Sequence, residues 1–170
     1  MPINHTAEDA ARDFATLLDI LRAEPDGMAK FEAVLGKPLV VSDFPPEAFT
    51  EHKNLKKSTS KWVASLGGDW SVSVSFEDFV TADRDVWFML MFRGKYVAGT
   101  HLYFVNDTLD LNHFTSSDGN VKVDLALWFW NDVEKYITRR VRTTLKAYND
   151  YLTNQAMYGS MISVYDIKVK

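Results

Sequence analysis

A strict alternation of apolar and serine residues in WSVSVSF, residues 70–76, constrains the fold more than any other feature. Apolar side chains at every second position give an extended strand one buried and one polar face. The next run, DVWFMLMF at 85–92, is apolar on both faces, which favours a strand inside a sheet. Further short runs end at turn residues. The pattern predicts an antiparallel meander of about five strands over residues 70–130, the last of them at 121–130.

Residues with helical spacing flank this predicted sheet. Thr6 and Asp9 resemble a capping box before an apolar stripe that runs to Leu21, and a second short helix ends at Gly36. After the sheet, Asn131 and Glu134 resemble a helix start. The apolar stripe that follows predicts one long helix: Val133, Ile137, Val141, Leu145, Tyr148 and Leu152.

These elements predict an α+β fold. At 170 residues the chain is long enough for a single domain with a substantial core. KPLVV at 37–41 is predicted to be a short strand. The expected organisation is a helical N-terminal part at 1–36, a long loop or short helix at 42–62, the sheet at 70–130, the long helix at 131–158 and a last strand at 160–169.

The turns of the predicted sheet also predict its register. A two-residue turn at Asn106-Asp107 places Phe104 opposite Leu109, and a three-residue turn at 93–95 places Trp87 beside His101. Extending the pairing to the strands at 108–114 and 121–130 brings three polar side chains into one row, His101, Asn112 and Asp124. His113 is expected on the opposite, apolar face.

Composition excludes several classes of site. The chain has no cysteine, which removes disulfides, thiolate nucleophiles and Cys-ligated metals, and its histidines lack metal-ligand spacing. Phosphate-binding and dinucleotide motifs are absent from the sequence, so no metal and no cofactor are expected. The N-terminus lacks a signal pattern and no apolar run is long enough to span a bilayer, so the expectation is a cytoplasmic protein without membrane contact.

The row around His101 is the best candidate for catalysis. His101 could act as an acid or base whose pKa is tuned by a neighbouring carboxylate. The candidate set is His101, Asn112, Asp124, Tyr103 and Asp110. The same residues also suit the hydrated side of an ordinary hairpin, and an enzyme is therefore less expected than a binding protein.

Aromatic, methionine and basic residues suggest binding instead. The candidate binding residues are Trp87, Met89, Tyr103, Phe114, Trp128, Lys56, Lys57, Lys61, Arg139, Arg142 and Lys146. An apolar sheet face that the helices leave open would be covered by another protein or by a second copy in a homodimer. We therefore expect a non-enzymatic protein that acts by protein–protein contact, such as a small inhibitor or accessory factor of phage or bacterial origin. The alternatives are single-stranded nucleic-acid binding by sheet aromatics and a basic helix flank, and third, a small hydrolase.

Overall fold

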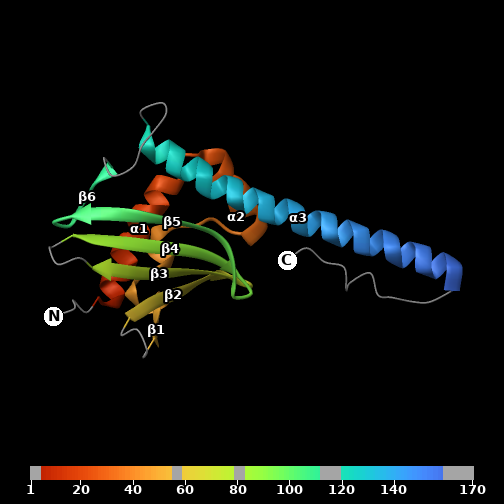
Figure 1. The fold of residues 1–170 in the computed structure, drawn as a ribbon, viewed down its shortest axis with the longest axis horizontal. Helices are drawn as coiled ribbons and strands as arrows, with labels where there is room; N and C mark the ends of the chain where they lie inside the picture. The colour runs from red at the N-terminus through yellow and green to blue at the C-terminus, as the bar shows by residue number, and fades with distance from the viewer. Residues whose placement is uncertain (1–4, 55–58, 79–82, 112–119, 159–170) are drawn as a thin grey trace. The chain divides into compact units, whose positions relative to one another are not determined.

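The computed structural model describes residues 5–54, 59–78, 83–111 and 120–158, and the chain divides into two compact units, Met1–Asp132 and Val133–Lys170. The helices are α1 (Ala7–Leu21), α2 (Pro25–Leu35), the short 3-10 helices η1 (Val41–Asp43) and η2 (Pro46–Ala48), and α3 (Val121–Tyr158). The strands are β1 (Thr50–Asn54), β2 (Thr59–Gly67), β3 (Trp70–Asp78), β4 (Arg84–Phe92), β5 (Lys95–Val105) and β6 (Thr108–Leu109). Figure 1 shows these elements. The residues of α3 up to Asp132 belong to the first unit.

The predicted α+β fold is confirmed. All the strands belong to one antiparallel sheet in the order β1-β2-β3-β4-β5-β6, so each strand pairs with its neighbours in the chain. In α1 the capping box forms as predicted, because the Thr6 hydroxyl accepts from the Asp9 backbone N–H while the Asp9 carboxylate accepts from that of Thr6. The α2 helix ends at Gly36, which has a left-handed φ of 78°.

The first two strands correct the prediction of a loop or short helix over residues 42–62. The segment folds into η1, η2, β1 and the start of β2, while KPLVV forms no strand. In β2, Ala64 and Leu66 are buried and alternate with Val63 and Ser65, which is a strand pattern. The proline pair and lysine run beside it obscured this alternation.

The prediction of a strand over residues 121–130 is wrong, because these residues form the first turns of α3. Asn120 rather than Asn131 is the polar residue at the helix start, and its side-chain oxygen accepts from the backbone N–H of Val123 at 3.2 Å. Leu125, Phe129 and Val133 are buried at intervals of four, which matches a helix. The β-branched and aromatic residues of this run gave a misleading strand signal.

The predicted hairpin register is confirmed at both tested positions. Phe104 pairs with Leu109 across the Asn106-Asp107 turn, and Trp87 pairs with His101. The turn before β5 has two residues rather than three, since Phe92 pairs with Lys95. A bulge between Leu90 and Met91 then shifts the pairing by one residue, so that Trp87 still pairs with His101. The strand predicted at 108–114 ends at Leu109. His113 and the strand predicted at 160–169 lie outside the described residues.

Trp130 ties the start of α3 to the N-terminal helices. Its indole N–H donates to the carbonyl oxygen of Leu21 at 3.0 Å, and its ring lies 5.6 Å from that of Phe31, centroid to centroid. Gly27 allows this approach, because a Cβ atom there would lie 2.3 Å from the Trp130 ring. Phe31 also packs edge-on against Trp70 of β3, at 5.1 Å. The helices therefore pack against the β3 side chains that point inward.

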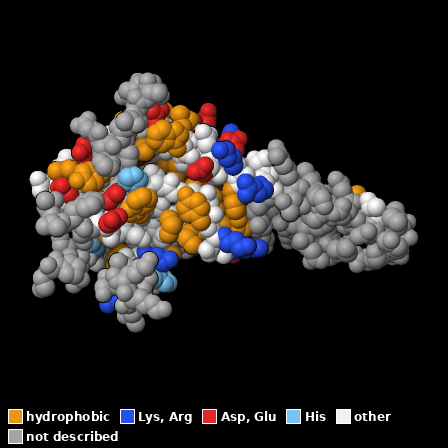
Figure 2. Space-filling model, viewed as in Figure 1, with side chains coloured by type: hydrophobic (Ala, Val, Ile, Leu, Met, Phe, Trp, Pro, Cys, Tyr) orange, Lys and Arg blue, Asp and Glu red, His pale blue; other side chains and the backbone are white. Residues whose placement is uncertain are grey.

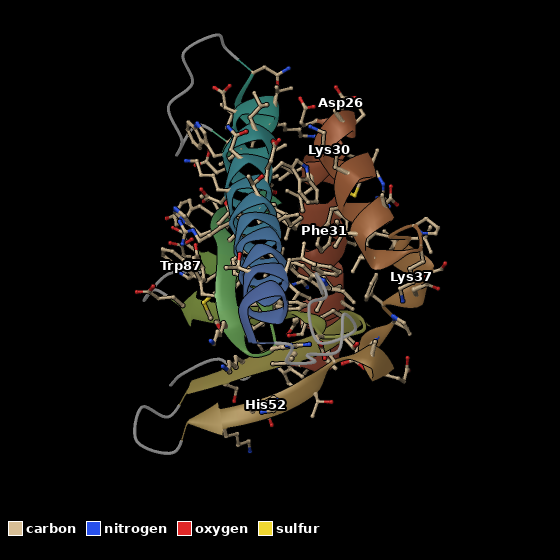
Figure 3. The ribbon with its side chains drawn as sticks, turned by 90° about the vertical axis from the view of Figure 1, so that its right-hand side faces the viewer. Asp26, Lys30, Phe31, Lys37, His52 and Trp87 are labelled. Carbon is tan, nitrogen blue, oxygen red and sulfur yellow. The ribbon has the colours of Figure 1, made fainter. Side chains whose placement is uncertain are left out.

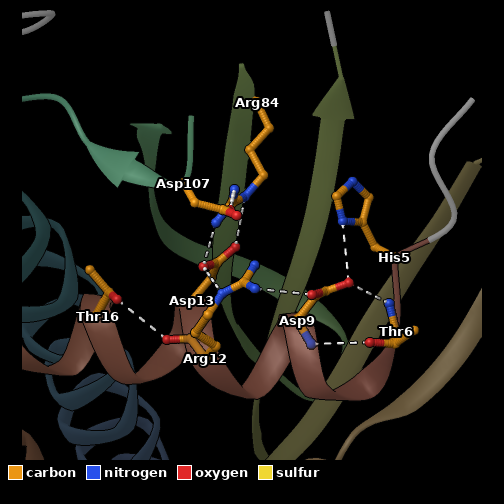
Figure 4. A network of polar contacts seen from close by, with 8 residues as sticks. All are labelled: His5, Thr6, Asp9, Arg12, Asp13, Thr16, Arg84 and Asp107. Atoms are coloured by element: carbon orange, nitrogen blue, oxygen red, sulfur yellow. Dashed lines mark hydrogen bonds and ion pairs between the residues drawn. The ribbon is translucent and has the colours of Figure 1, made fainter. Parts of the chain in front are cut away.

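A buried ion pair fastens α1 to the sheet. The Arg84 guanidinium at the start of β4 donates through Nε and Nη2 to the two carboxylate oxygens of Asp13, at 3.2 and 3.0 Å (Figure 4). Both side chains are buried, and Arg84 also pairs with Asp107 in the β5–β6 turn. Because a forked guanidinium fits a carboxylate in one orientation, this contact fixes the position of α1 on β4.

Candidate binding face of the sheet

The sheet has two unlike faces. Val72, Val74, Val86, Phe88 and Leu90 are buried under the helices, and the alternate residues of the same strands point to the other side. In Figure 3, Trp87 lies on the opposite side of the sheet from Phe31 and Lys30 of α2. We call this second side the outer face; its members are Lys61, Val63, Ser71, Ser73, Ser75, Asp85, Trp87, Met89, Met91, Tyr96, Gly99, His101 and Tyr103.

Large apolar side chains lie exposed in the middle of the outer face. Trp87 is 43% exposed and Tyr96 58% exposed, while Met89 and Met91 on β4 are half-buried. On the β3 side their cross-strand neighbours are serines, so the aromatic and methionine side chains stand above short ones. Figure 2 views this face and shows apolar side chains gathered over the sheet, with acidic side chains and a histidine toward one end.

His101 is held by two neighbours on β4. Its Nδ1 atom lies 2.7 Å from Oδ1 of Asp85, and its ring stacks on the indole of Trp87 with centroids 4.5 Å apart and planes 15° from parallel. An ionised carboxylate can only accept, so Nδ1 of His101 is the donor in this hydrogen bond. Asp85 therefore orients the His101 ring, and Trp87 stacks on that ring.

Tyr103 extends the polar end of the outer face. Its hydroxyl donates to Oδ2 of Asp83 at 3.1 Å, and its backbone carbonyl accepts from the N–H of Asp110 at 2.8 Å. Burial raises the pKa of the Tyr103 phenol, and the hydrogen bond to Asp83 and the negative charges of Asp83, Asp110 and Asp85 raise it further. Tyr103 is therefore a neutral donor among carboxylates at physiological pH.

This end of the outer face is negatively charged. Asp83, Asp85 and Asp110 lie near Tyr103, and Asp85 also contacts His101 and pairs with Glu77 across β3 and β4. Within the part of the chain that the structure describes, no group of three or more acidic, histidine or cysteine side chains is arranged to hold a metal ion. The arrangement suits hydrogen bonding and attraction of a cationic group on a partner.

The structure brings together only part of the predicted catalytic row. His101, Tyr103 and Asp110 meet at the polar end of the outer face. Asp124 lies on α3 rather than on a neighbouring strand, so its predicted place in the row with His101 is wrong. Asn112 lies outside the described residues. The carboxylate that contacts His101 is Asp85, which the sequence reasoning missed.

The predicted binding residues divide among several places. Trp87, Met89, Tyr103 and Lys61 lie on the outer face. Trp128 is 56% exposed but lies on α3, because the predicted strand at 121–130 is a helix. Arg139, Arg142 and Lys146 lie on α3 in the second unit, and Arg139 is exposed. Lys56, Lys57 and Phe114 lie outside the described residues.

Asp85 could have been found from the sequence. Once Trp87 is placed beside His101, strand periodicity puts Asp85 opposite Tyr103 and diagonal to His101 on the same face. Asp83 precedes β4 and carries no periodic signal, because loop residues follow no strand repeat. The contact of Asp83 with Tyr103 could therefore be identified only in the structure.

Comparisons with known proteins leave the site to be interpreted from its geometry. No protein-family model matches the chain, and neither curated proteins nor solved structures show a significant match. Over the described ranges, none of the helices is both long and apolar enough to cross a membrane.

Proposed function

We propose that this chain is a binding protein that recognises another protein with the outer face of its sheet. The observation that carries the proposal is Trp87, a large aromatic side chain that is 43% exposed and stacks on the hydrogen-bonded ring of His101. An aromatic ring whose orientation is already fixed loses little conformational freedom on binding. Tryptophan is also the residue type most enriched at binding hot spots.

The chemistry of the outer face defines the partner. Trp87, Met89, Met91 and Tyr96 provide an apolar centre of the composition that protein interfaces favour. Asp83, Asp85 and Asp110 provide negative charge at one end of the same face. We infer a partner protein that presents apolar side chains beside one or more Lys or Arg residues, since charge complementarity selects among apolar surfaces.

Affinity capture with a pair of tryptophan variants tests this proposal. The full chain, Trp87→Ala and Trp128→Ala are each immobilised, and proteins bound from the native host's lysate are quantified by mass spectrometry. Truncating a central aromatic anchor costs about 2 kcal/mol or more, so Trp87→Ala is expected to weaken capture of the partner roughly 30-fold.

Trp128→Ala is the matched control, because Trp128 is an equally large and more exposed tryptophan that lies on α3 instead of the sheet. It is expected to capture the same partner as the unmodified chain. Equal capture by all three proteins, or loss only with Trp128→Ala, would contradict the proposal. Circular dichroism of each variant checks that its fold is intact.

A further inference from the structure

The charges of the chain are divided between its two units. Residues 133–170 contain seven Lys and Arg side chains and three Asp and Glu side chains. Residues 1–132 contain twelve Lys and Arg side chains and twenty Asp and Glu side chains. The formal net charge of −4 for the whole chain therefore hides a positively charged second unit. The two units therefore differ in the charge of the ligands that they can attract.

Most of this positive charge lies on α3. In an α-helix successive residues are about 100° apart, so positions 135, 139, 142 and 146 fall within an arc of about 60° along about 16 Å of the axis. Each of these positions carries Lys or Arg, and the structure confirms that α3 is helical through all of them. Lys135 and Arg139 are exposed. We call Lys135, Arg139, Arg142 and Lys146 the basic stripe.

Few acidic residues accompany the basic stripe along the helix. Glu134 is the one carboxylate among residues 133–149, and its position lies about 80–140° around the helix axis from those of the stripe. The next, Asp150, comes four positions after Lys146 and therefore lies on the same side of the helix, at the end of the stripe. The stripe therefore consists of four basic positions at intervals of about 4.5–6 Å along one side of the helix.

We propose that the basic stripe of α3 binds the phosphate backbone of a nucleic acid. Arginine suits this ligand, because its planar guanidinium forms paired hydrogen bonds with phosphate oxygens. Binding of this kind depends on charge and not on base sequence. The proposal does not involve the outer face of the sheet, so it can be tested independently of the proposed protein partner.

An anionic membrane surface is the competing polyanion, and the residues of α3 favour nucleic acid over it. A helix that lies in a membrane interface buries an apolar side rich in Trp, Phe and Leu. The apolar stripe of α3 from position 133 carries Val, Ile, Val, Leu, Tyr and Leu. It begins at Val133, which is already buried and is only 3% exposed. The first residue of the apolar stripe is therefore not free to insert into a membrane.

Fluorescence anisotropy with labelled oligonucleotides tests the proposal on the full chain. A single-stranded and a duplex 20-mer of mixed sequence are titrated at several salt concentrations. With four phosphate contacts, the logarithm of the observed association constant is expected to fall linearly with the logarithm of the salt concentration. The expected slope is about −3 for the single strand and about −4 for the duplex. The two probes show which form of nucleic acid the helix prefers.

Lys135→Ala with Arg139→Ala removes two of the four contacts and is expected to halve the slope and weaken binding at least tenfold in low salt. Lys37→Ala with Lys95→Ala, two exposed lysines of the first unit, is the control and is expected to leave both unchanged. Arg139→Lys keeps the charge and is expected to retain most of the binding.

Three results would overturn the inference. They are no binding of either oligonucleotide at low salt, an equal loss of oligonucleotide binding in the two double variants, or binding of the chain to vesicles of phosphatidylcholine and phosphatidylserine but not to the oligonucleotides.

Discussion

The carboxylate of Asp9 makes the stability of the start of α1 depend on pH. Burial raises the pKa of Asp9, but the backbone hydrogen bond from Thr6 and the charges of Arg12 and His5 outweigh it, and the net shift is downward. A lowered folded-state pKa contributes stability that is present above the unfolded value and lost as pH falls through the folded value.

Replacing Asp9 with Asn is therefore expected to lower the free energy of unfolding by about 1 kcal/mol at neutral pH, since it removes a charged cap at a helix start. The difference between the variant and the unmodified chain should shrink as pH falls below about 3.9, the ordinary value for aspartate. Urea titrations at a series of pH values measure this. A difference that stays constant with pH would contradict the assigned role.

Asp13 and Arg84 form a pair whose removal should be costly. Asp13→Ala leaves the buried Arg84 without its main counter-charge and is expected to cost about 3–5 kcal/mol of unfolding free energy. Asp107→Ala removes the other, 74% exposed partner of Arg84 and should cost less than about 1 kcal/mol. Chemical denaturation of both variants compares them, and equal costs would contradict the placement of Asp13 in the buried pair.

At the scale of the elements, the close approach of α2 and α3 depends on Gly27. A methyl group at this position would meet Trp130 at 2.3–2.6 Å, so Gly27→Ala is expected to cost about 1–3 kcal/mol, despite the better helix propensity of alanine. Combining Gly27→Ala with Trp130→Leu should cost less than the sum of the two single changes. Thermal or urea unfolding of the four proteins gives this coupling, and strict additivity would show that the two residues are not in contact.

The strands and helices also show what sequence patterns can and cannot predict. Alternation in WSVSVSF and helical spacing in α1 act over a few neighbouring residues, so both elements were predicted correctly. The run at 121–130 has both a strand-like composition and a helical spacing of buried residues, and only packing against Leu21 and Phe31 decides between them. The partner of His101 depended on the same error, because Asp124 was placed on a strand that does not exist.

At the scale of the whole molecule, we assign two binding surfaces to two units: the outer face to the first and the basic stripe to the second. Trp87→Ala is expected to weaken protein capture and leave oligonucleotide affinity unchanged. Lys135→Ala with Arg139→Ala is expected to do the reverse. Both assays on both variants measure this independence, and parallel loss in the two assays would show that the surfaces act as one.

Hydroxyl-radical footprinting of the complex tests whether the outer face of the sheet contacts a partner protein. Trp87, Met89 and Met91 carry oxidisable side chains on this face, and Trp128 provides an internal reference on α3. Oxidation is measured by mass spectrometry for the full chain, alone and with the partner recovered by capture. The partner is expected to protect Trp87 and Met89 several-fold, while Trp128 is oxidised as before. Unchanged oxidation of Trp87 in a saturated complex would contradict this expectation.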